Sequence, residues 1–503
     1  MATLSVAAIL AENARRRPRK EALVEGGLRL TFADVWQRAL ARAGALVELG
    51  VRPGDRVALM APNTAEFPQA YYAIAAAGGV VVPVHLLLSA EEVEHVLTDS
   101  GATLLLCHPA QAGTGTAAAR AAGLRVIQLG TEFAELAAGA EPLTSYVTRE
   151  ADDPAVVFYT SGTTGVPKGA VLSHFNLVMN ATVNAFDAND IRPDDIALGA
   201  LPLFHAFGQT VSMNSVWRAG ATLVLLPRFD AARAIELMTE ENVNTFHGVP
   251  TMFVALAAAA AGAGRLPGLR VCVSGGASLP VAVLERFETA FGAKIYEGYG
   301  LSETSPAASV NQPVFGARPG TIGHPLWGVD VEIARAEVEG RIELLPPDEL
   351  GEVVIRGHNV FAGYLGRPEA TAEALVDGWF RTGDLGTKDD EGFLRIVDRK
   401  KDVIIRGGYN VYPREVEEVL ARHPAIAQVA VIGLPDDLHG EEVCAVVVPA
   451  PGAAPDPAGL TEWSKEHLGR HKYPRRVEYT DALPLGPSMK VLKRELRVRY
   501  AAG

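Results

Sequence analysis

Amphipathic helical stretches alternate with short β-branched runs between about residues 30 and 300. A helix-like segment at 32–49, for example, is followed by a strand-like segment at 56–61. This alternation is typical of βαβ units, whose parallel sheets are covered by helices on both faces. From 330 to 397 short strand patterns follow one another between Gly and Pro turns, which predicts a smaller and more antiparallel β subdomain.

A charge cluster at 398–402, Asp-Arg-Lys-Lys-Asp, interrupts this pattern. Beyond it the chain begins a new mixed unit, with a strand after the cluster, a helix at 413–423, two further strands and a helix at 458–470. We therefore predict two domains, residues 1–397 and 398–503, with a hinge near Asp398.

Composition narrows the class of protein. The chain has 503 residues, 48% of them hydrophobic, which is too long for a single core. Its apolar runs are much shorter than the roughly 20 residues of a membrane-spanning helix, and the charges near the N-terminus follow the apolar stretch, unlike those of a signal peptide. Three cysteines without a CxxC pair support neither a disulfide framework nor a zinc site. We expect a cytoplasmic protein with at most weak peripheral membrane contact. The net charge of −13 argues against nucleic acid as a partner.

A phosphate-binding loop is indicated at 156–169, VVFYTSGTTGVPKG. An apolar strand leads into hydroxyl-bearing and glycine residues, followed by a lysine: Thr160, Ser161, Gly162, Thr163, Thr164, Gly165 and Lys168. Free backbone N–H groups and hydroxyls suit the oxygens of a triphosphate. A P-loop NTPase would need Ser or Thr directly after the lysine, where this chain has Gly169. A flexible turn is the alternative reading of such a cluster.

The string YTSGTTGVPKG at 159–169 resembles the phosphate loop of the adenylate-forming (AMP-binding) superfamily, which contains acyl-CoA synthetases, peptide-synthetase adenylation domains and beetle luciferases. Similar motifs follow in the family's order: LPLFHAFG at 201–208, GYGLSET at 298–304, WFRTGDLG at 379–386 and DRKKDVIIRGGYNVYPREVE at 398–417. The resemblance implies an α/β fold. A large N-terminal domain of two α/β subdomains and a β subdomain would be joined to a small, mobile C-terminal α+β lid.

The same resemblance implies an ATP-dependent acyl-CoA synthetase. Such an enzyme converts a carboxylate and ATP to acyl-AMP and pyrophosphate, then transfers the acyl group to coenzyme A with release of AMP. Activation requires charge neutralisation and in-line geometry at the α-phosphorus. The family's pattern assigns catalytic roles to Lys490, His205 and Glu303, and places Mg²⁺ on Thr160 and Glu303, whose hard oxygens suit that ion.

The lysine match has one departure. Where the family commonly has Thr-Gly before the catalytic lysine, this chain has Ser488-Met489 after Pro487. Loss of the glycine removes easy access to positive φ. Lys493 is the alternative candidate for the catalytic lysine.

Nucleotide and coenzyme A contacts also follow from the resemblance. Tyr299 would stack on adenine, Asp384 would bind the ribose, and Arg399 would bind the sugar or a phosphate. The other implied ATP or AMP contacts are Gly276, Ala277, Glu297, Gly298, Gly300 and Ser302. The hairpin that would line the tunnel for coenzyme A comprises Arg406, Gly407, Gly408 and Tyr409.

The acyl pocket is expected around His205 and Phe207. The other expected walls are small or apolar: Gly208, Val211, Val249, Gly275 and Gly298. An α-amino acid would need a counter-charge where this chain has His205, and a malonate-type acid would need an arginine that 296–299 does not supply. We predict a medium- or long-chain fatty acid. An aryl or cinnamate-type acid remains open, as do an enzyme that stops at the adenylate and a non-catalytic nucleotide-binding homologue.

Overall fold

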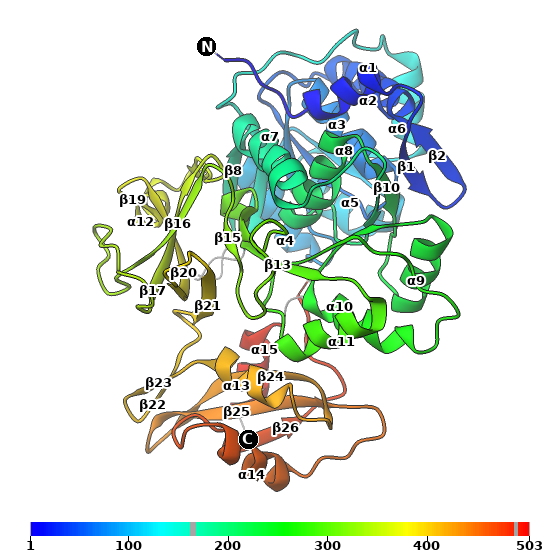
Figure 1. Ribbon diagram of the computed structural model, residues 1–503. Helices are drawn as coiled ribbons and strands as arrows, with labels where there is room; N and C mark the ends of the chain where they lie inside the picture. Colours follow the sequence, from blue (N-terminus) through cyan, green and yellow to red (C-terminus); the bar gives the residue numbers. More distant parts are fainter. Residues whose placement is uncertain (1, 161–166, 487–490, 502–503) are drawn as a thin grey trace.

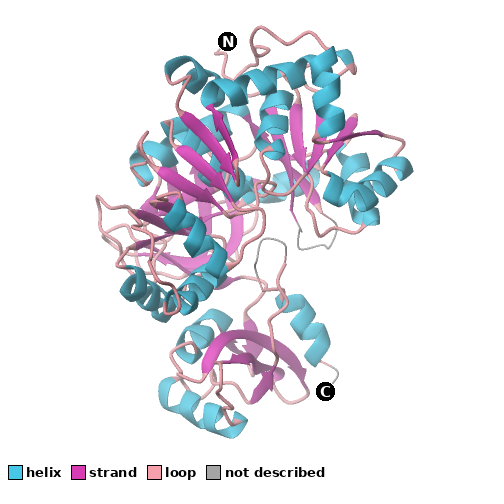
Figure 2. Cartoon of the chain, turned by 90° about the vertical axis from the view of Figure 1, so that its right-hand side faces the viewer, coloured by secondary structure: helices cyan, strands magenta, loops and turns pink. Residues whose placement is uncertain are grey.

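The computed structural model describes residues 2–160, 167–486 and 491–501. The chain forms a large N-terminal body and a small C-terminal body, and both views show the small one set apart below the large one (Figures 1 and 2). No helix in these described ranges has the length and apolar character needed to cross a membrane.

The first sheet of the large domain has nine strands. Its order is β15-β14-β13-β12-β11-β9-β10-β1-β2, with parallel pairing from β13 through to β1. Strand β12 is buried at every position, as expected for a strand covered on both faces. The strands span Glu21–Glu25 (β1), Leu28–Thr31 (β2), Ile196–Gly199 (β9), Thr222–Leu225 (β10), Thr245–Gly248 (β11), Val271–Ser274 (β12), Ile295–Gly300 (β13), Ala307–Val310 (β14) and His324–Pro325 (β15).

The second sheet has seven strands in the order β18-β8-β7-β4-β3-β5-β6. Strand β7 runs antiparallel to β8, and β18 pairs with the other side of β8. The strands span Arg56–Met60 (β3), Val80–Pro83 (β4), Leu104–Cys107 (β5), Arg125–Gln128 (β6), Pro154–Thr160 (β7), Lys168–Ser173 (β8) and Gly363–Tyr364 (β18).

Helices cover both sheets. The largest core packs α2, α3, α7 and α8 between the two sheets, whereas α9 to α11 cover the outer face of the first sheet and α4 and α5 that of the second. The α-helices of the large domain span Ala8–Arg16 (α1), Phe32–Glu48 (α2), Glu66–Ala76 (α3), Ala90–Ser100 (α4), Ala112–Ala121 (α5), Thr131–Gly139 (α6), His174–Val183 (α7), Ser215–Ala219 (α8), Ala231–Glu240 (α9), Pro250–Ala260 (α10), Val281–Phe291 (α11) and Pro368–Ala374 (α12). The large domain also contains two short 3₁₀ turns, Pro109–Gln111 (η1) and Ser302–Thr304 (η4). It has two π-helical stretches, Asn184–Ala188 (η2) and Phe207–Asn214 (η3).

The third sheet forms the expected antiparallel β subdomain. Its order is β16-β17-β20-β19, and β21 pairs with β20. The strands span Val329–Ala334 (β16), Gly351–Gly357 (β17), Leu375–Val376 (β19), Trp379–Lys388 (β20) and Leu394–Arg399 (β21). Because Asp384 on β20 pairs with Arg399 on β21, these two residues share one face of the ladder.

The small domain has its own five-stranded sheet, in the order β23-β22-β25-β24 with β26 beside β25. Its elements span Ile404–Arg406 (β22), Tyr409–Val411 (β23), Pro413–Leu420 (α13), Ile426–Asp436 (β24), Gly440–Pro449 (β25), Pro457–His467 (α14), Arg476–Tyr479 (β26) and Lys493–Tyr500 (α15).

The predicted hinge residue Asp398 lies near the end of β21. Strand β21 continues to Arg399, so Asp398 still pairs with Leu385 of the large domain. The first strand of the small domain begins at Ile404. The expected division into two α/β subdomains, a β subdomain and a small C-terminal domain is confirmed.

Candidate active site

A cleft of about 1880 Å³ opens where the two sheets, the β subdomain and the small domain meet. Residues far apart in the sequence line it, from Pro83 at the end of β4 to Glu495 in α15. The small domain contributes Leu485, Leu492 and Glu495. Ligand pockets usually enclose about 300–1,000 Å³, so this cleft has room for more than one small molecule.

A buried carboxylate stands at the centre of the cleft. Glu303, 7% exposed, lies in the short turn η4 after β13. Its Oε1 accepts one hydrogen bond from the Thr160 hydroxyl at 3.3 Å and another from the Tyr364 hydroxyl at 3.0 Å. Within the described part of the chain, its Oε2 accepts none. Burial, together with the Glu303 charge, raises the pKa of Tyr364, so this phenol stays protonated and donates.

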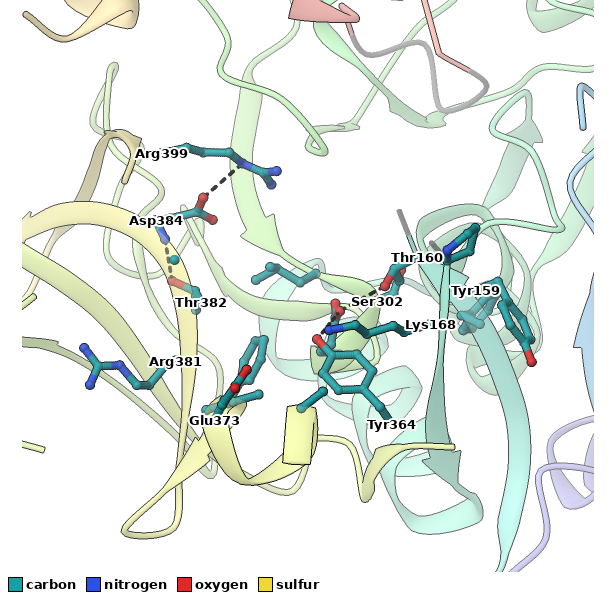
Figure 3. Close-up of a pocket in the computed structure, with 18 of the residues that line it drawn as sticks. Tyr159, Thr160, Lys168, Ser302, Tyr364, Glu373, Arg381, Thr382, Asp384 and Arg399 are labelled. Atoms are coloured by element: carbon teal, nitrogen blue, oxygen red, sulfur yellow. Dashed lines mark hydrogen bonds and ion pairs between the residues drawn. The ribbon is translucent and has the colours of Figure 1, made fainter. Parts of the chain in front are cut away.

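Lys168 lies close to Tyr364, one of the two residues that bond Glu303. It begins β8, and its Nζ lies 5.5 Å from the centre of the Tyr364 ring, within range of a cation–π interaction (Figure 3). Thr160 and Lys168 thus stand on either side of the expected phosphate loop. The other expected loop residues lie outside the described residues: Ser161, Gly162, Thr163, Thr164 and Gly165.

A second polar group is built around Asp384, which is 3% exposed. Its Oδ2 accepts from the Tyr299 hydroxyl at 2.6 Å. Its Oδ1 lies 3.1 Å from Arg399 Nε (Figure 3). Gly383 has φ of +71°, a turn conformation that glycine adopts readily, and its N–H bonds Glu352 at 3.0 Å. Asp384 raises the pKa of Arg399, which therefore remains charged.

A smaller cavity of about 80 Å³ adjoins the cleft. The two spaces share four lining residues: His205, Gly300, Leu301 and Ser302. Among the expected pocket residues, those that line the smaller cavity are His205, Phe207, Val211, Gly275 and Gly298. Five of the expected nucleotide contacts line it as well: Gly276, Gly298, Tyr299, Gly300 and Ser302.

Two expected wall residues do not line this cavity. A Cβ on Gly208 would lie 2.2 Å from the Pro202 carbonyl oxygen, so Gly208 serves close packing of the chain. Val249 is 3% exposed and belongs to the core beneath α10. Composition alone made both look like pocket walls, because small apolar residues are equally suited to packing.

The expected nucleotide contacts divide into three sets. Those in the large cleft are Thr160, Lys168, Gly300, Ser302, Asp384 and Arg399. Gly276, Gly298 and Tyr299 line the smaller cavity. Ala277 and Glu297 line neither space: Ala277 is exposed, and Glu297 is buried with its Oε1 accepting from Leu279 N at 3.1 Å.

Lys490 lies outside the described residues. The alternative, Lys493, is held away from the cleft, because its Nζ pairs with Glu417 Oε1 at 2.7 Å. Burial favours the neutral amine, but Glu417 and Asp398 outweigh it and raise the pKa of Lys493. A lysine committed to that carboxylate is poorly placed to bridge a substrate in the cleft.

The expected coenzyme A hairpin connects β22 to β23 at the outer edge of the small domain (Figure 1). Gly407 and Gly408 have φ of +57° and +82°, and Tyr409 is 61% exposed. None of the hairpin residues Arg406 to Tyr409 lines the cleft in this arrangement.

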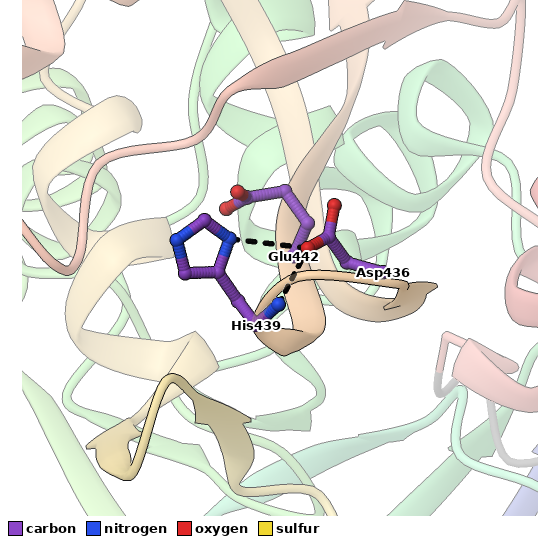
Figure 4. Close-up of side chains that lie close together, drawn as sticks. All are labelled: Asp436, His439 and Glu442. Carbon is purple, nitrogen blue, oxygen red and sulfur yellow. Dashed lines mark hydrogen bonds and ion pairs between the residues drawn. The ribbon is translucent and has the colours of Figure 1, made fainter.

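A cluster of Asp436, His439 and Glu442 braces this hairpin (Figure 4). Its ligand atoms lie within 4.8 Å of one another, as in a metal site. However, Glu442 binds Arg406 through both oxygens at 2.6 and 2.9 Å, and Asp436 Oδ1 accepts from His439 at its ring and backbone nitrogens. Since the carboxylates are already engaged, we interpret the cluster as structural support for Arg406.

Sequence reasoning missed several contributors to the cleft, among them Tyr364, Lys400 and Lys401. Tyr364 comes from the two-residue strand β18, and the Gly-aromatic segment around it was the only available signal. Lys400 and Lys401, which follow Arg399, also line the cleft. In the sequence they belong to the charge cluster at 398–402.

Comparison with known proteins decides the family. Residues 10–365 match the AMP-binding enzyme family, and residues 415–490 match the AMP-binding enzyme C-terminal domain. The chain belongs to the AMP-binding enzyme family. A feruloyl-CoA synthase from an Amycolatopsis species is 41% identical over 97% of each chain, and a long-chain-fatty-acid–CoA ligase from Bacillus subtilis is 36% identical over 97% of this chain and 93% of that one.

The fold is also that of solved family members. ATP-bound MatB from Rhodopseudomonas palustris is 33% identical and superposes with a TM-score of 0.91, covering 98% of this chain and 99% of that chain. The apo structure of the same MatB gives a TM-score of 0.81. This AMP-binding enzyme is therefore an AMP-forming acid–CoA ligase that binds ATP and a carboxylic acid.

Proposed function

We propose that this acid–CoA ligase acts on an aromatic acid of the cinnamate class. The observation that carries the proposal is the small cavity between Phe207, Gly275 and Gly298. A Cβ on Gly275 would lie 3.2 Å from the Phe207 ring, so the glycine lets this aromatic side chain pack closely into the wall of the cavity. Aromatic side chains in a pocket wall pack favourably against an aromatic ligand.

The size of the cavity supports the same class. A water molecule needs about 10–15 Å³ of such space, so about 80 Å³ corresponds to roughly six waters. A substituted ring with a short unsaturated arm fits this space, whereas a long alkyl tail would have to leave it. The 41% identity to a feruloyl-CoA synthase points the same way.

A medium- or long-chain fatty acid is the second candidate. The 36% identity to the long-chain ligase from Bacillus subtilis favours it. An alkyl tail would run out of the smaller cavity through its mouth at His205 and Ser302 into the large cleft. The cavity of about 80 Å³ is small for a long alkyl tail, which makes the fatty acid the weaker candidate.

Mg²⁺ fits the carboxylate at the centre of the cleft. Glu303 is buried, its Oε2 accepts no hydrogen bond from the described residues, and the Thr160 hydroxyl stands beside it. Hard oxygen ligands of this kind are those that Mg²⁺ prefers. Glu303 and Thr160 would hold the ion, and the ion would neutralise phosphate charge when bound.

The remaining nucleotide roles follow from the contacts around Asp384. Its carboxylate would accept hydrogen bonds from the ribose hydroxyls, while Arg399 would donate to the sugar or to phosphate. The Tyr299 ring lies where the two cavities adjoin, which suits stacking on adenine. Lys168 would face the phosphates from the edge of β8.

The proposed reaction has two steps, adenylation of the acid and transfer of the acyl group to coenzyme A. A carboxylate oxygen attacks the α-phosphorus of ATP, pyrophosphate leaves, and Lys490 would stabilise the charge shared between the two reacting groups. The thiol of coenzyme A, as its thiolate, then attacks the acyl carbon, and AMP leaves. His205 would shape the entrance to the acyl cavity, and the hairpin at Arg406 to Tyr409 would line the path of coenzyme A.

A substrate panel tests the proposal. The purified enzyme is given ATP, Mg²⁺ and coenzyme A with hydroxycinnamates, cinnamate, benzoate, octanoate or palmitate, and each acyl-CoA is measured by mass. We expect kcat/KM for a cinnamate-class acid to exceed that for palmitate at least tenfold. A preference for palmitate would refute the aromatic assignment and leave the ligase assignment intact.

A further inference from the structure

A buried charge pair joins the two domains. Arg414, in the first turn of α13 in the small domain, has a side chain only 9% exposed. Its Nη2 lies 3.9 Å from Oε1 of Glu297, on β13 of the large domain, whose side chain is 3% exposed. Within the described part of the chain, Glu297 Oε2 is buried without a hydrogen-bond partner. Arg414 thus supplies the positive charge that faces a buried carboxylate of β13.

Arg414 also binds residues at the junction itself. Its Nη1 donates to the carbonyl of Ile396, and its backbone N–H donates to Asp398 Oδ2 at 2.9 Å. Only its Nε contact, to Glu418 at 3.2 Å, stays within its own helix. A rotation of the small domain about the junction would therefore break the contacts to Glu297 and Ile396 and keep the one to Glu418.

The orientation that this pair stabilises is the one that closes the cleft. Leu485, Leu492 and Glu495 of the small domain line it in this arrangement. The whole chain superposes better on ATP-bound MatB, at a TM-score of 0.91, than on apo MatB, at 0.81. The two structures of that relative thus differ in their overall similarity to this chain.

We propose that Arg414 and Glu297 are positioning residues that hold the small domain in the adenylating orientation, an inference that rests on the proposed two-step reaction. Neither residue lines the cleft or the acyl cavity, so neither touches substrate. They act through the domain orientation. Separating a buried pair leaves a carboxylate that either stays charged without a counter-ion, which is strongly unfavourable, or takes up a proton.

The charged groups around Glu297 support this role. Burial raises the pKa of Glu297 to about 7, Arg414 lowers it, and Glu418 on α13 raises it. Once Arg414 moves away, the principal group that lowers this pKa is lost, and Glu297 takes up a proton near neutral pH. The large domain can then keep the side chain buried as a neutral acid.

Measurement of the two half-reactions separately tests the proposal. Adenylation is followed as pyrophosphate release without coenzyme A, and thioester formation is followed from supplied acyl-AMP and coenzyme A. For Arg414→Met and for Glu297→Gln we expect adenylation to fall at least fivefold while thioester formation stays within twofold of wild type or rises. The double variant should be no slower than the slower single variant, because both remove the same contact.

Glu418→Gln is the matched control. It removes the partner of Arg414 that lies in the same helix, so both half-reactions should stay near wild type. If both half-reactions fall in parallel in Arg414→Met and Glu297→Gln, or if the two substitutions add, the positioning role is wrong. If wild type adenylates no acid, the proposed function itself fails. Should Arg414→Met not fold, the near-isosteric Glu297→Gln still decides between these outcomes.

Discussion

Replacing Asp384 with Ala should weaken nucleotide binding more than any other single change in the β subdomain. The carboxylate is buried and accepts from Tyr299 at 2.6 Å, with Arg399 at 3.1 Å. Hydrogen bonds to charged groups contribute about 1.5–3 kcal/mol each. Two such bonds from the ribose would contribute twice this free energy. However, Asp384 already bonds Tyr299 and Arg399 without nucleotide, so part of that gain is lost. We therefore expect a net loss of about 1.5–3 kcal/mol, or roughly tenfold to a hundredfold in the KM for ATP.

The assay is pyrophosphate release at varied ATP with saturating acid, supported by calorimetric titration with AMP. Two variants serve as controls. Tyr299→Phe removes one hydroxyl and should have a smaller effect, and Asp390→Ala makes the same chemical change at an exposed site nearby and should have none. A folded Asp384→Ala enzyme whose KM for ATP and affinity for AMP stay within twofold of wild type would refute the ribose assignment.

Three further predictions concern the pocket, the metal and pH. Val310→Ala enlarges the acyl cavity, so kcat/KM for acids with one more methylene should rise about tenfold relative to the wild-type substrate; unchanged selectivity would contradict the cavity assignment. Glu303→Gln should slow adenylation roughly a hundredfold and raise the Mg²⁺ needed for half-maximal rate, and an unchanged Mg²⁺ titration would exclude this carboxylate as a ligand. Burial raises the pKa of Glu297 from 4.5 to about 7, so its contribution to the free energy of unfolding is complete below about pH 4.5 and lost as pH rises through about 7. Urea unfolding at pH 5 and pH 8 should show a smaller loss of stability in Glu297→Gln than in wild type, and equal losses would contradict it.

The hydrophobic pattern predicts the ends of helices to within a few residues where its periodicity is strong. The helix expected at 32–49 spans Phe32–Glu48, and its start is fixed by a capping box in which Thr31 and Asp34 bond reciprocally. The helix expected at 413–423 ends three residues earlier, at Leu420. Helix ends depend on local caps and tertiary contacts, which periodicity does not encode.

The site was predictable only where a motif names its residues. Thr160, Glu303, Asp384 and Arg399 converge on one cleft although 239 positions separate the first from the last. Contacts made by residues outside the motifs were not foreseen. Tyr364 reaches Glu303 because a two-residue strand adds to the edge beside β8, and no periodic pattern marks so short an element.

Glu297 and Gly208 are motif positions that make structural contacts in the described part of the chain. Glu297 is turned to Leu279 and Arg414 instead of the cleft, and Gly208 is small because the Pro202 carbonyl approaches it closely. Successive side chains of a strand point to opposite faces, so Glu297 and its neighbours on β13 face different surroundings.

The central claim is that a carboxylic acid is activated as its adenylate before transfer to coenzyme A. Its most direct test uses a cinnamate-class acid labelled with ¹⁸O in the carboxylate, incubated with ATP, Mg²⁺ and coenzyme A. Because a carboxylate oxygen attacks the α-phosphorus and stays with it, the account predicts acyl-CoA together with AMP that carries one ¹⁸O. Acyl-CoA formed with unlabelled AMP, or with ADP and phosphate in place of AMP, would contradict it.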